Sequence, residues 1–313
     1  MEQQKRVIVI SGPTATGKSA LGVALCRRLD GEIISADSMQ IYRGMDIGTA
    51  KITAEEMNGV PHHMLDIAEP TEDFSVSRWV DMAAACAEDI FARGKVPVIV
   101  GGTGLYIDSL LSGRDFAQSE GNGALREQLS AAYDAMGGEA FREKLRQVDP
   151  ERAEKLHPAD KKRLVRALEI YELTGQTISA HDAATQALPP RWDSLRFALN
   201  YAQREDLYRR IDQRVEQMAA QGLFDEVRRL LAQGLSPEST AMQAIGYKEV
   251  VASVRGEASP EQAIALIQQN SRRYAKRQLT WLRRDKELHW FHWGSQPDVE
   301  QAAREAVALW QQG

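Results

Sequence analysis

A glycine-containing loop near the N-terminus has the residue types and spacing of a phosphate-binding site. The run Gly12-Pro13-Thr14-Ala15-Thr16-Gly17-Lys18-Ser19 matches the pattern G-x-x-x-x-G-K-S. In such a loop, backbone N–H groups converge on an anion, the lysine adds a positive charge, and the serine hydroxyl can bind Mg²⁺. The loop therefore predicts a polyphosphate site, with Lys18 at the phosphates and Ser19 as the metal ligand. The pattern does not distinguish ATP or GTP from another diphosphate ester, and a chance match in a glycine-containing turn is the simplest alternative.

A carboxylate, Asp37, follows an apolar run and is the candidate for a general base. A nucleotide hydrolase normally places an acidic residue after a hydrophobic strand to hold water around its magnesium ion. The apolar run Val96 to Val100 instead leads into Gly101-Gly102-Thr103, which offers no carboxylate. Since the carboxyl ends of strands in an open α/β sheet face one crevice, Asp37 is expected to face the phosphate loop. The alternative is a structural role, in which Asp37 caps the next turn through the N–H of Ser38 or Met39.

The loop and Asp37 require elements that hold them at one edge of a sheet. Short apolar runs bounded by turn residues indicate buried strands, and apolar residues at helical spacing indicate helices between them. Strands that alternate with helices indicate a parallel sheet. The predicted fold class is α/β, a P-loop NTPase-like parallel sheet flanked by helices. The expected strands are Val7 to Ile10, Glu32 to Ala36, Val96 to Val100, Leu195 to Tyr201 and Leu288 to Trp293, and the expected helices are Ala20 to Leu29, Ser75 to Arg93, Arg204 to Gln233 and Pro260 to Arg284.

The middle of the chain has a different character. From residue 114 to residue 190 the sequence is charged and favours helices, shows no convincing strand, and is broken at residues such as Pro150 and Pro158. We therefore expect an all-helical insertion domain at 114–190. The α/β core domain is expected to comprise residues 1–113 and 191–313.

Composition limits the classes of protein that remain. The 313 residues are 43% hydrophobic, enough to bury a full core, and the formal net charge of -5 argues against indiscriminate coating of nucleic acid. The two cysteines, Cys26 and Cys86, exclude a disulfide framework and indicate a reducing compartment. The apolar run Val7 to Ile10 is too short for a signal peptide or a membrane span. We expect a cytoplasmic protein, monomeric and without a membrane partner.

Longer runs of the sequence resemble the bacterial type of the tRNA dimethylallyltransferases, also called tRNA isopentenyltransferases. The resemblance covers nearly the whole chain, and the segment Gln118 to Asn122 departs from the family pattern. Besides the phosphate loop, the matching runs are Ser35 to Lys51, Pro61 to Asp66, Gly101 to Tyr106, Asp160 to Glu169, Ala244 to Lys248 and Tyr274 to Arg283.

The resemblance implies transfer of a dimethylallyl group from dimethylallyl diphosphate to the exocyclic N6 amine of the adenine just 3′ of the anticodon. The diphosphate is then the leaving group. Lys18, the loop amides and a Mg²⁺ ion held partly by Ser19 would stabilise the charge that grows as the carbon–oxygen bond breaks. Asp37 is assigned as the base that removes the proton from the amine. Thr14 and Arg214 are implied as further contacts to the diphosphate.

The implied partner is a tRNA anticodon stem-loop, from which the target adenine must be extruded. Cationic side chains cluster in the C-terminal part of the expected helix Pro260 to Arg284, and a second cluster lies in the insertion. Charged runs alone more often form a solvated surface. Thr103, taken alone, would be a helix N-cap. The residues that the resemblance assigns to tRNA contact are Asp37, Ser38, Met39, Gln40, Thr103, Arg126, Lys162, Arg163, Arg166, Gly246, Tyr247, Lys248, Lys276 and Arg277.

Parts of the sequence are also compatible with three other functions and one other site. A small-molecule kinase would use the same loop for ATP, a relative could prenylate free adenine nucleotides, and an RNA-binding module could keep an inactive loop. The pair His62-His63 with Asp66 suggests a metal site, but no further ligand cluster completes it, so a packed, hydrogen-bonded turn is favoured. The intact Lys18 and Asp37 disfavour the inactive module.

Overall fold

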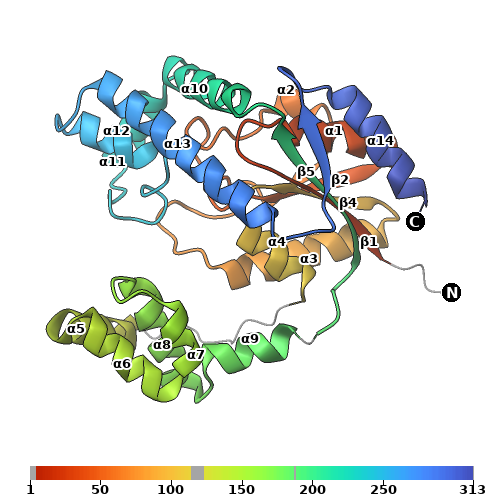
Figure 1. Ribbon diagram of the computed structural model, residues 1–313. Coiled ribbons are helices and arrows are strands. Elements are labelled where there is room, and N and C mark those ends of the chain that lie inside the picture. Colours follow the sequence, from red (N-terminus) through yellow and green to blue (C-terminus); the bar gives the residue numbers. More distant parts are fainter. Residues whose placement is uncertain (1–4, 114–122, 187, 313) are drawn as a thin grey trace. The chain divides into compact units, whose positions relative to one another are not determined.

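Two compact units make up the chain. One unit comprises Met1–Leu111 and Trp192–Gly313, and the other comprises Ser112–Arg191. Each has its own buried apolar core. No helix in the described part of the chain is long and apolar enough to cross a membrane. The computed structural model describes residues 5–113, 123–186 and 188–312 (Figure 1).

The larger unit is built on a parallel sheet, which confirms the predicted α/β class. The strand order is β3-β2-β4-β1-β5-β6, and all neighbouring pairs in the described part are parallel. The central strands are nearly continuous apolar runs because both faces of the sheet are covered. The strands are β1 (Arg6–Ser11), β2 (Gly31–Ala36), β3 (His62–His63), β4 (Val96–Gly101), β5 (Asp193–Tyr201) and β6 (His289–Trp293).

Three strands end at the same level of this sheet. Ser11, the last residue of β1, pairs with Gly101 of β4, and Ala36, the last residue of β2, pairs with the same glycine. The phosphate loop after β1, Asp37 after β2 and the Gly102-Thr103 turn after β4 therefore leave the sheet together. This common edge brings together the candidate residues that follow separate strands.

Helices cover both faces of the sheet (Figure 1). α1 and α14 pack against each other over one face, and α3 and α4 pack together over the other. The core under α1 contains Leu21 and Leu25 of the helix and Ile8 and Ile10 of β1, all fully buried. These helices, with one short helix in the loop after β2, are α1 (Lys18–Leu29), α2 (Ala54–Met57), α3 (Val76–Ala92), α4 (Gly104–Leu111) and α14 (Val299–Gln312).

The C-terminal half adds a group of helices. The single helix expected from Arg204 to Gln233 is two helices, because Gly222 adopts a φ of 103°, which a residue with a side chain rarely takes. The sequence reading missed α12, which is short, and α14, whose buried positions are alanines that give a weak periodic signal. The helices are α10 (Arg204–Ala220), α11 (Leu223–Ala232), α12 (Tyr247–Val254) and α13 (Pro260–Leu282).

The smaller unit contains helices and no strand among its described residues. Its core packs Leu129, Phe141, Leu145 and Leu164 against one another. The predicted departure at Gln118 to Asn122 lies outside the described residues. The helices are α5 (Gly123–Met136), α6 (Gly138–Val148), α7 (Pro150–Lys155), α8 (Lys161–Thr174) and α9 (Ile178–Gln186).

Candidate active site

The phosphate loop joins β1 to α1 and is tied down by the C-terminal half of the chain. Within the loop, the Thr16 hydroxyl donates a hydrogen bond to the carbonyl of Pro13 at 2.8 Å. The indole N–H of Trp293, in β6, donates to the carbonyl of Thr16 at 2.8 Å. The loop opens into the N-terminus of α1, where the first N–H groups of a helix lack helical partners and favour an anion. Ser19, the predicted metal ligand, is exposed in this first turn.

Lys18 is a partly buried amine beside this loop. Its Nζ donates to the carbonyl of Pro13 at 2.7 Å, and it forms no ion pair within the described residues. The pKa of Lys18 is lowered to about 7, first by burial and then by the positive charge of Arg214, while the charge of Asp37 acts in the opposite direction. An anion in the loop would offset both unfavourable effects on the charged amine.

Arg214 reaches the same loop from α10. Its Nη1 donates to the hydroxyl of Thr14 at 3.2 Å, and its Nη2 donates to the carbonyl of Ala50 at 3.4 Å. Burial lowers the pKa of Arg214, and the charge of Asp37 opposes this effect. The structure thus brings Thr14, Lys18 and Arg214 together, although Arg214 is far from the loop in sequence. Two cations converge on one short segment, an arrangement suited to a polyphosphate.

Asp37 has two carboxylate oxygens in different surroundings. Oδ1 accepts hydrogen bonds from the backbone N–H of Met39 at 2.8 Å and of Gln40 at 3.3 Å, so the turn-capping interpretation describes this oxygen. For Oδ2, the described residues provide no hydrogen-bond partner. The capping bonds fix the plane of the carboxylate and leave one oxygen for another group.

The loop that follows Asp37 is anchored from α11. Glu226 is buried, and its carboxylate accepts the N–H groups of Asp46, Ile47 and Gly48 at 2.9 to 3.1 Å. The hydroxyl of Tyr247 donates to the same carboxylate at 2.6 Å. A Cβ at Gly48 would lie 2.4 Å from the Tyr247 ring, so only glycine allows this packing. The carboxylate holds the loop through three hydrogen bonds, and the fourth, from Tyr247, fixes the carboxylate itself.

Two of the predicted RNA contacts lie beside this anchor. Tyr247 is fully buried, and Gly246 before it is buried as well. Only Lys248 of that predicted set is exposed. Tyr247 supports the loop through Glu226, and its contact with RNA stays a prediction. The sequence reading missed Glu226, because a buried glutamate on a helix has no local signature.

Gln40 also serves its own loop. Its amide nitrogen donates to the carbonyls of Thr49 at 3.2 Å and Ala50 at 3.3 Å, and its oxygen accepts from the hydroxyl of Ser35 at 3.3 Å. Both amide protons are therefore in use. The predicted reading of a base edge by Gln40 stays a prediction, and Ser38, Met39 and Gln40 are all partly exposed.

Thr103 connects two of the strand ends. Its hydroxyl accepts from the N–H of Ser38 at 3.2 Å, and its own N–H donates to the carbonyl of Ala36 at 3.2 Å. Tyr274 of α13 lies nearby: burial raises its pKa to about 12, the charge of Asp37 adds to the rise, and side-chain hydrogen bonds with Thr103 and Gln278 act against it. The turn after β4 therefore borders Asp37.

Gln278 is a further site residue that sequence reasoning missed. Its side chain, on α13, contacts the phosphate loop and the turn after β4 at once. It lies in the matching run Tyr274 to Arg283, where the basic residues drew attention. A polar residue at an apolar position of a helix stripe is the signal that could have identified it.

The basic residues predicted to bind RNA are exposed to different degrees. On α13, Lys276 and Arg277 are exposed, and Arg277 lies over the Tyr274 ring at 5.4 Å. Lys162 of α8 is exposed and forms no ion pair with any described residue, whereas Arg163 pairs with Asp160 at 3.2 Å.

Arg126 and Arg166 share one buried partner in the smaller unit. The carboxylate of Glu169, which is fully buried, accepts from Arg126 Nε at 3.2 Å and from Arg166 Nη1 at 2.8 Å. Removing either arginine would leave this buried charge less well compensated. Both guanidinium groups are partly exposed beyond this contact.

His62 and His63 do not form the turn that was favoured for them. They form β3 and pair in parallel with β2. His63 Nε2 lies 2.8 Å from the carboxylate of Glu32, whose pKa is lowered to about 2, first by its hydrogen bond from Arg93. Within the described residues, no group of three or more His, Cys, Asp or Glu side chains could hold a metal ion. The pair has a structural role at the sheet edge.

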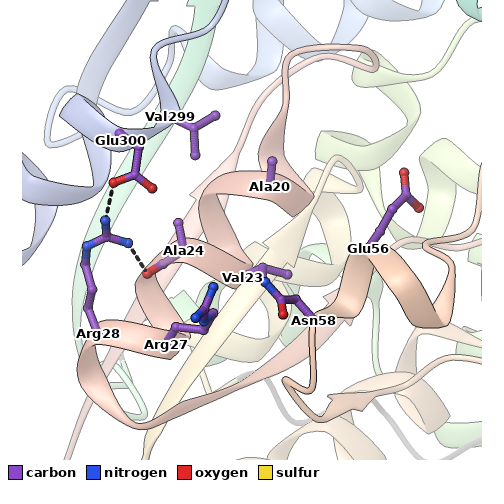
Figure 2. Close-up of a pocket in the computed structure, with 9 residues that line it drawn as sticks. All are labelled: Ala20, Val23, Ala24, Arg27, Arg28, Glu56, Asn58, Val299 and Glu300. Atoms are coloured by element: carbon purple, nitrogen blue, oxygen red, sulfur yellow. Dashed lines mark hydrogen bonds and ion pairs between the residues drawn. The ribbon is translucent and has the colours of Figure 1, made fainter.

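A cavity of about 550 Å³ lies along α1, outside this group of residues (Figure 2). Arg28 crosses one side, donating to the carbonyl of Ala24 at 2.8 Å and forming an ion pair with Glu300. None of the predicted catalytic residues lines it. The lining residues are Ala20, Val23, Ala24, Arg27, Arg28, Glu56, Asn58, Val299 and Glu300.

Comparison with known proteins gives a consistent result. The family described as IPP transferase matches residues 40–285, and the family described as isopentenyl transferase matches residues 5–71. A tRNA dimethylallyltransferase of Caldanaerobacter subterraneus is 48% identical over 287 residues, which cover 91% of each chain. A tRNA dimethylallyltransferase of Geobacillus thermodenitrificans is also 48% identical, covering 92% of this chain and 90% of the relative.

Solved structures agree with these sequence matches. The full-length tRNA isopentenylpyrophosphate transferase of Bacillus halodurans is 40% identical, with a TM-score of 0.73 and coverage of 98% of this chain and 96% of its own. A eukaryotic dimethylallyltransferase, whose structure is described as acting on tRNA, is 30% identical, with a TM-score of 0.84 and coverage of 98% and 79%. Since sequence and fold agree, the chain belongs to the tRNA dimethylallyltransferase family of transferases.

Proposed function

We propose that this enzyme transfers a dimethylallyl group from dimethylallyl diphosphate to the N6 amine of the adenine just 3′ of a tRNA anticodon. The observation that carries the proposal is the placement of Lys18, Arg214 and Thr14 at the phosphate loop, with Asp37 at the next strand end. The names of the relatives support both the dimethylallyl group and the tRNA.

The phosphate loop is suited to hold the diphosphate as a leaving group. As the bond between the allylic carbon and the bridging oxygen breaks, negative charge grows on the diphosphate. Lys18, Arg214 and the N–H groups at the start of α1 lie where they can stabilise this charge. The reaction moves carbon rather than phosphorus, so the loop needs no water-activating residue.

The residues present fit a magnesium ion that arrives with its substrate. Mg²⁺ keeps several waters and commonly binds through one or two protein oxygens and substrate phosphates. The exposed hydroxyl of Ser19, in the first turn of α1, is such an oxygen, and the described residues form no cluster that would hold the ion alone. When bound, Mg²⁺ would neutralise charge on the diphosphate.

Asp37 is proposed to take the proton. The N6 nitrogen forms a bond to the allylic carbon while the carbon–oxygen bond breaks, and the nitrogen then loses one proton. With Oδ1 fixed by two N–H groups, Oδ2 can accept that proton. An adenine amine does not need to be deprotonated before attack, so a carboxylate held in position is sufficient.

The RNA is proposed to bind through exposed basic side chains as an anticodon stem-loop. Lys276 and Arg277 of α13, and Lys162 and Arg163 of α8, are exposed and suited to phosphates. The adenine must leave its stack to reach Asp37. We further propose that the enzyme is a cytoplasmic monomer, which agrees with its two free cysteines.

The experiment is a transfer assay with dimethylallyl diphosphate, Mg²⁺ and an anticodon stem-loop that carries adenine 3′ of the anticodon. The expected result is one added dimethylallyl group on that adenine, located by mass spectrometry of RNA fragments. A matched stem-loop with guanine at that position should remain unmodified. Transfer to AMP but not to RNA would favour a nucleotide prenyltransferase, and ATP-dependent phosphorylation would favour a kinase.

A further inference from the structure

One side of α13 faces the phosphate loop after β1 and the turn after β4. Gln278 accepts the N–H of Thr14 through Oε1 at 3.1 Å and donates from Nε2 to the carbonyl of Gly102 at 3.0 Å. Its side chain is buried, with 8% of the residue exposed. A single amide thus joins the phosphate loop to the turn after β4.

The same turn reaches the candidate base. Thr103, next to Gly102, accepts the N–H of Ser38, which follows Asp37 directly. The chain of contacts therefore runs from Thr14 through Gln278 and this turn to the segment of Asp37. Thr14 also binds Arg214, so one end of the chain lies at the proposed leaving group and the other at the proposed base.

The rest of the helix side is packed closely against this turn. A Cβ at Gly104 would lie 2.3 Å from the Trp281 ring, and the Trp281 indole N–H donates to Asp108 at 3.1 Å. Gln278 and Trp281 lie three residues apart and so share a face of α13. This close packing limits the movement of α13 against the turn and holds the Gln278 amide in one orientation.

We propose that Gln278 is a positioning residue that sets the separation and alignment between the diphosphate leaving group and Asp37. The inference rests on the proposed function. In-line displacement requires the base, the amine, the allylic carbon and the leaving oxygen to be aligned, and a displacement of about 1 Å can reduce the rate about a hundredfold. Gln278 acts through Thr14 and Gly102 and does not itself touch the reacting atoms.

Gln278→Leu removes these two hydrogen bonds, and the side-chain contact with Tyr274, at similar volume. At saturating substrates, kcat should fall about a hundredfold, as expected for misplacement of reacting groups. The dissociation constant for the stem-loop should change less than twofold. Gln268→Leu is the matched control on the same helix: the Gln268 amide donates only at 3.4 Å, to the carbonyl of Asp212 and the carboxylate of Glu216, and its kcat should stay within twofold of wild type.

The variant Gln278→Glu can make one of the two hydrogen bonds when its carboxyl group is ionised and both when the group is protonated. A carboxylate can still accept the Thr14 N–H, but it opposes the carbonyl oxygen of Gly102. A protonated carboxyl group can donate to that carbonyl and restore the contact. The ratio of variant to wild-type kcat should therefore rise as the pH falls, and using the ratio cancels every pH effect that both proteins share. Gln278→Leu should show a ratio that is independent of pH.

Several outcomes overturn the inference. Retention of kcat within twofold in Gln278→Leu would do so, as would a loss confined to RNA affinity or a ratio for Gln278→Glu that does not vary with pH. If Gln278→Leu has a low melting temperature, the deciding test is the kcat of Gln278→Glu relative to wild type at each pH. Absence of product with the wild-type enzyme and with Gln268→Leu would instead overturn the proposed function, and this inference with it.

Discussion

The phosphate loop and the loop after Asp37 differ in how their buried charges are paired. In the loop after Asp37, Lys51 is nearly buried but pairs with Asp46 at 2.7 Å and with Asp66 at 2.5 Å, and Glu226 is satisfied by four donors. At the phosphate loop, Lys18 has a carbonyl as its partner and no ion pair with any described residue.

This difference distinguishes charged residues that support the fold from charged residues that bind a ligand. Charges that only hold backbone in place are compensated within the protein, because a buried uncompensated charge destabilises the fold. Charges that await a ligand are left uncompensated, and the lowered pKa values of Lys18 and Arg214 reflect this. The comparison predicts that changes at the phosphate loop and at Asp37 reduce activity, while changes in the anchors reduce stability.

The largest effect is expected from Asp37→Asn. The asparagine oxygen can still accept the N–H of Met39, so the turn should survive, but the base is lost. The rate of transfer should fall by about 10² to 10⁴, the usual contribution of a general base. Single-turnover assays with saturating stem-loop would measure it. Asp46→Asn is the control in the same loop, and full activity in Asp37→Asn would exclude Asp37 as the base.

Lys18→Met should reduce affinity for dimethylallyl diphosphate by about tenfold to a hundredfold, the effect of losing a hydrogen bond to a charged group. In the wild type, the pKa of about 7 leaves Lys18 mostly neutral at pH 8. Bound diphosphate favours the charged amine, so binding at pH 8 should take up a proton. Calorimetry in two buffers of different ionisation enthalpy would detect this uptake. Equal uptake in Lys18→Met would assign the proton to another group.

Glu226→Gln tests the anchor of the other loop. An amide places an NH₂ group against backbone N–H donors, so the free energy of unfolding should fall by about 2 to 3 kcal/mol. Denaturant titration would measure the change, with Asp225→Asn, at an exposed position beside it, as the control. A rate loss as large as that of Asp37→Asn, without loss of stability, would break the distinction between anchor and active site.

The smallest effect is expected from Tyr247→Phe. This change removes one hydrogen bond to Glu226 and keeps the ring that packs on Gly48, so the free energy of unfolding should fall by about 1 kcal/mol. Affinity for the stem-loop, measured by fluorescence anisotropy, should stay within twofold. A tenfold loss of RNA affinity at unchanged stability would instead assign Tyr247 to RNA contact, as the sequence predicts.

Features encoded locally could be predicted from the sequence. The phosphate loop is a continuous pattern, and Asp37 follows a strand whose end must meet that loop in a parallel sheet. Most strand positions followed from apolar runs of ordinary length. The helix expected from Arg204 to Gln233 was wrong at Gly222, because its apolar spacing continues across a glycine whose backbone breaks the helix.

The supporting residues could not be predicted, because their partners are distant in sequence. Gln278 meets Thr14, and Glu226 meets the backbone after Met45, only when the C-terminal helices pack onto the sheet. The structural roles of Tyr247 and Gln40 were missed for the same reason: a polar side chain in a matching run can hold its own protein in place as well as contact a ligand.

The central claim is that the phosphate loop holds a departing diphosphate. It is tested most directly by measuring released diphosphate and modified adenosine in the same reaction, with dimethylallyl diphosphate, Mg²⁺ and stem-loop but without ATP. The account predicts one diphosphate for each N6-dimethylallyladenosine, and loss of both in Lys18→Met at low substrate concentration. Modification that requires ATP, or release of monophosphate in place of diphosphate, would contradict it.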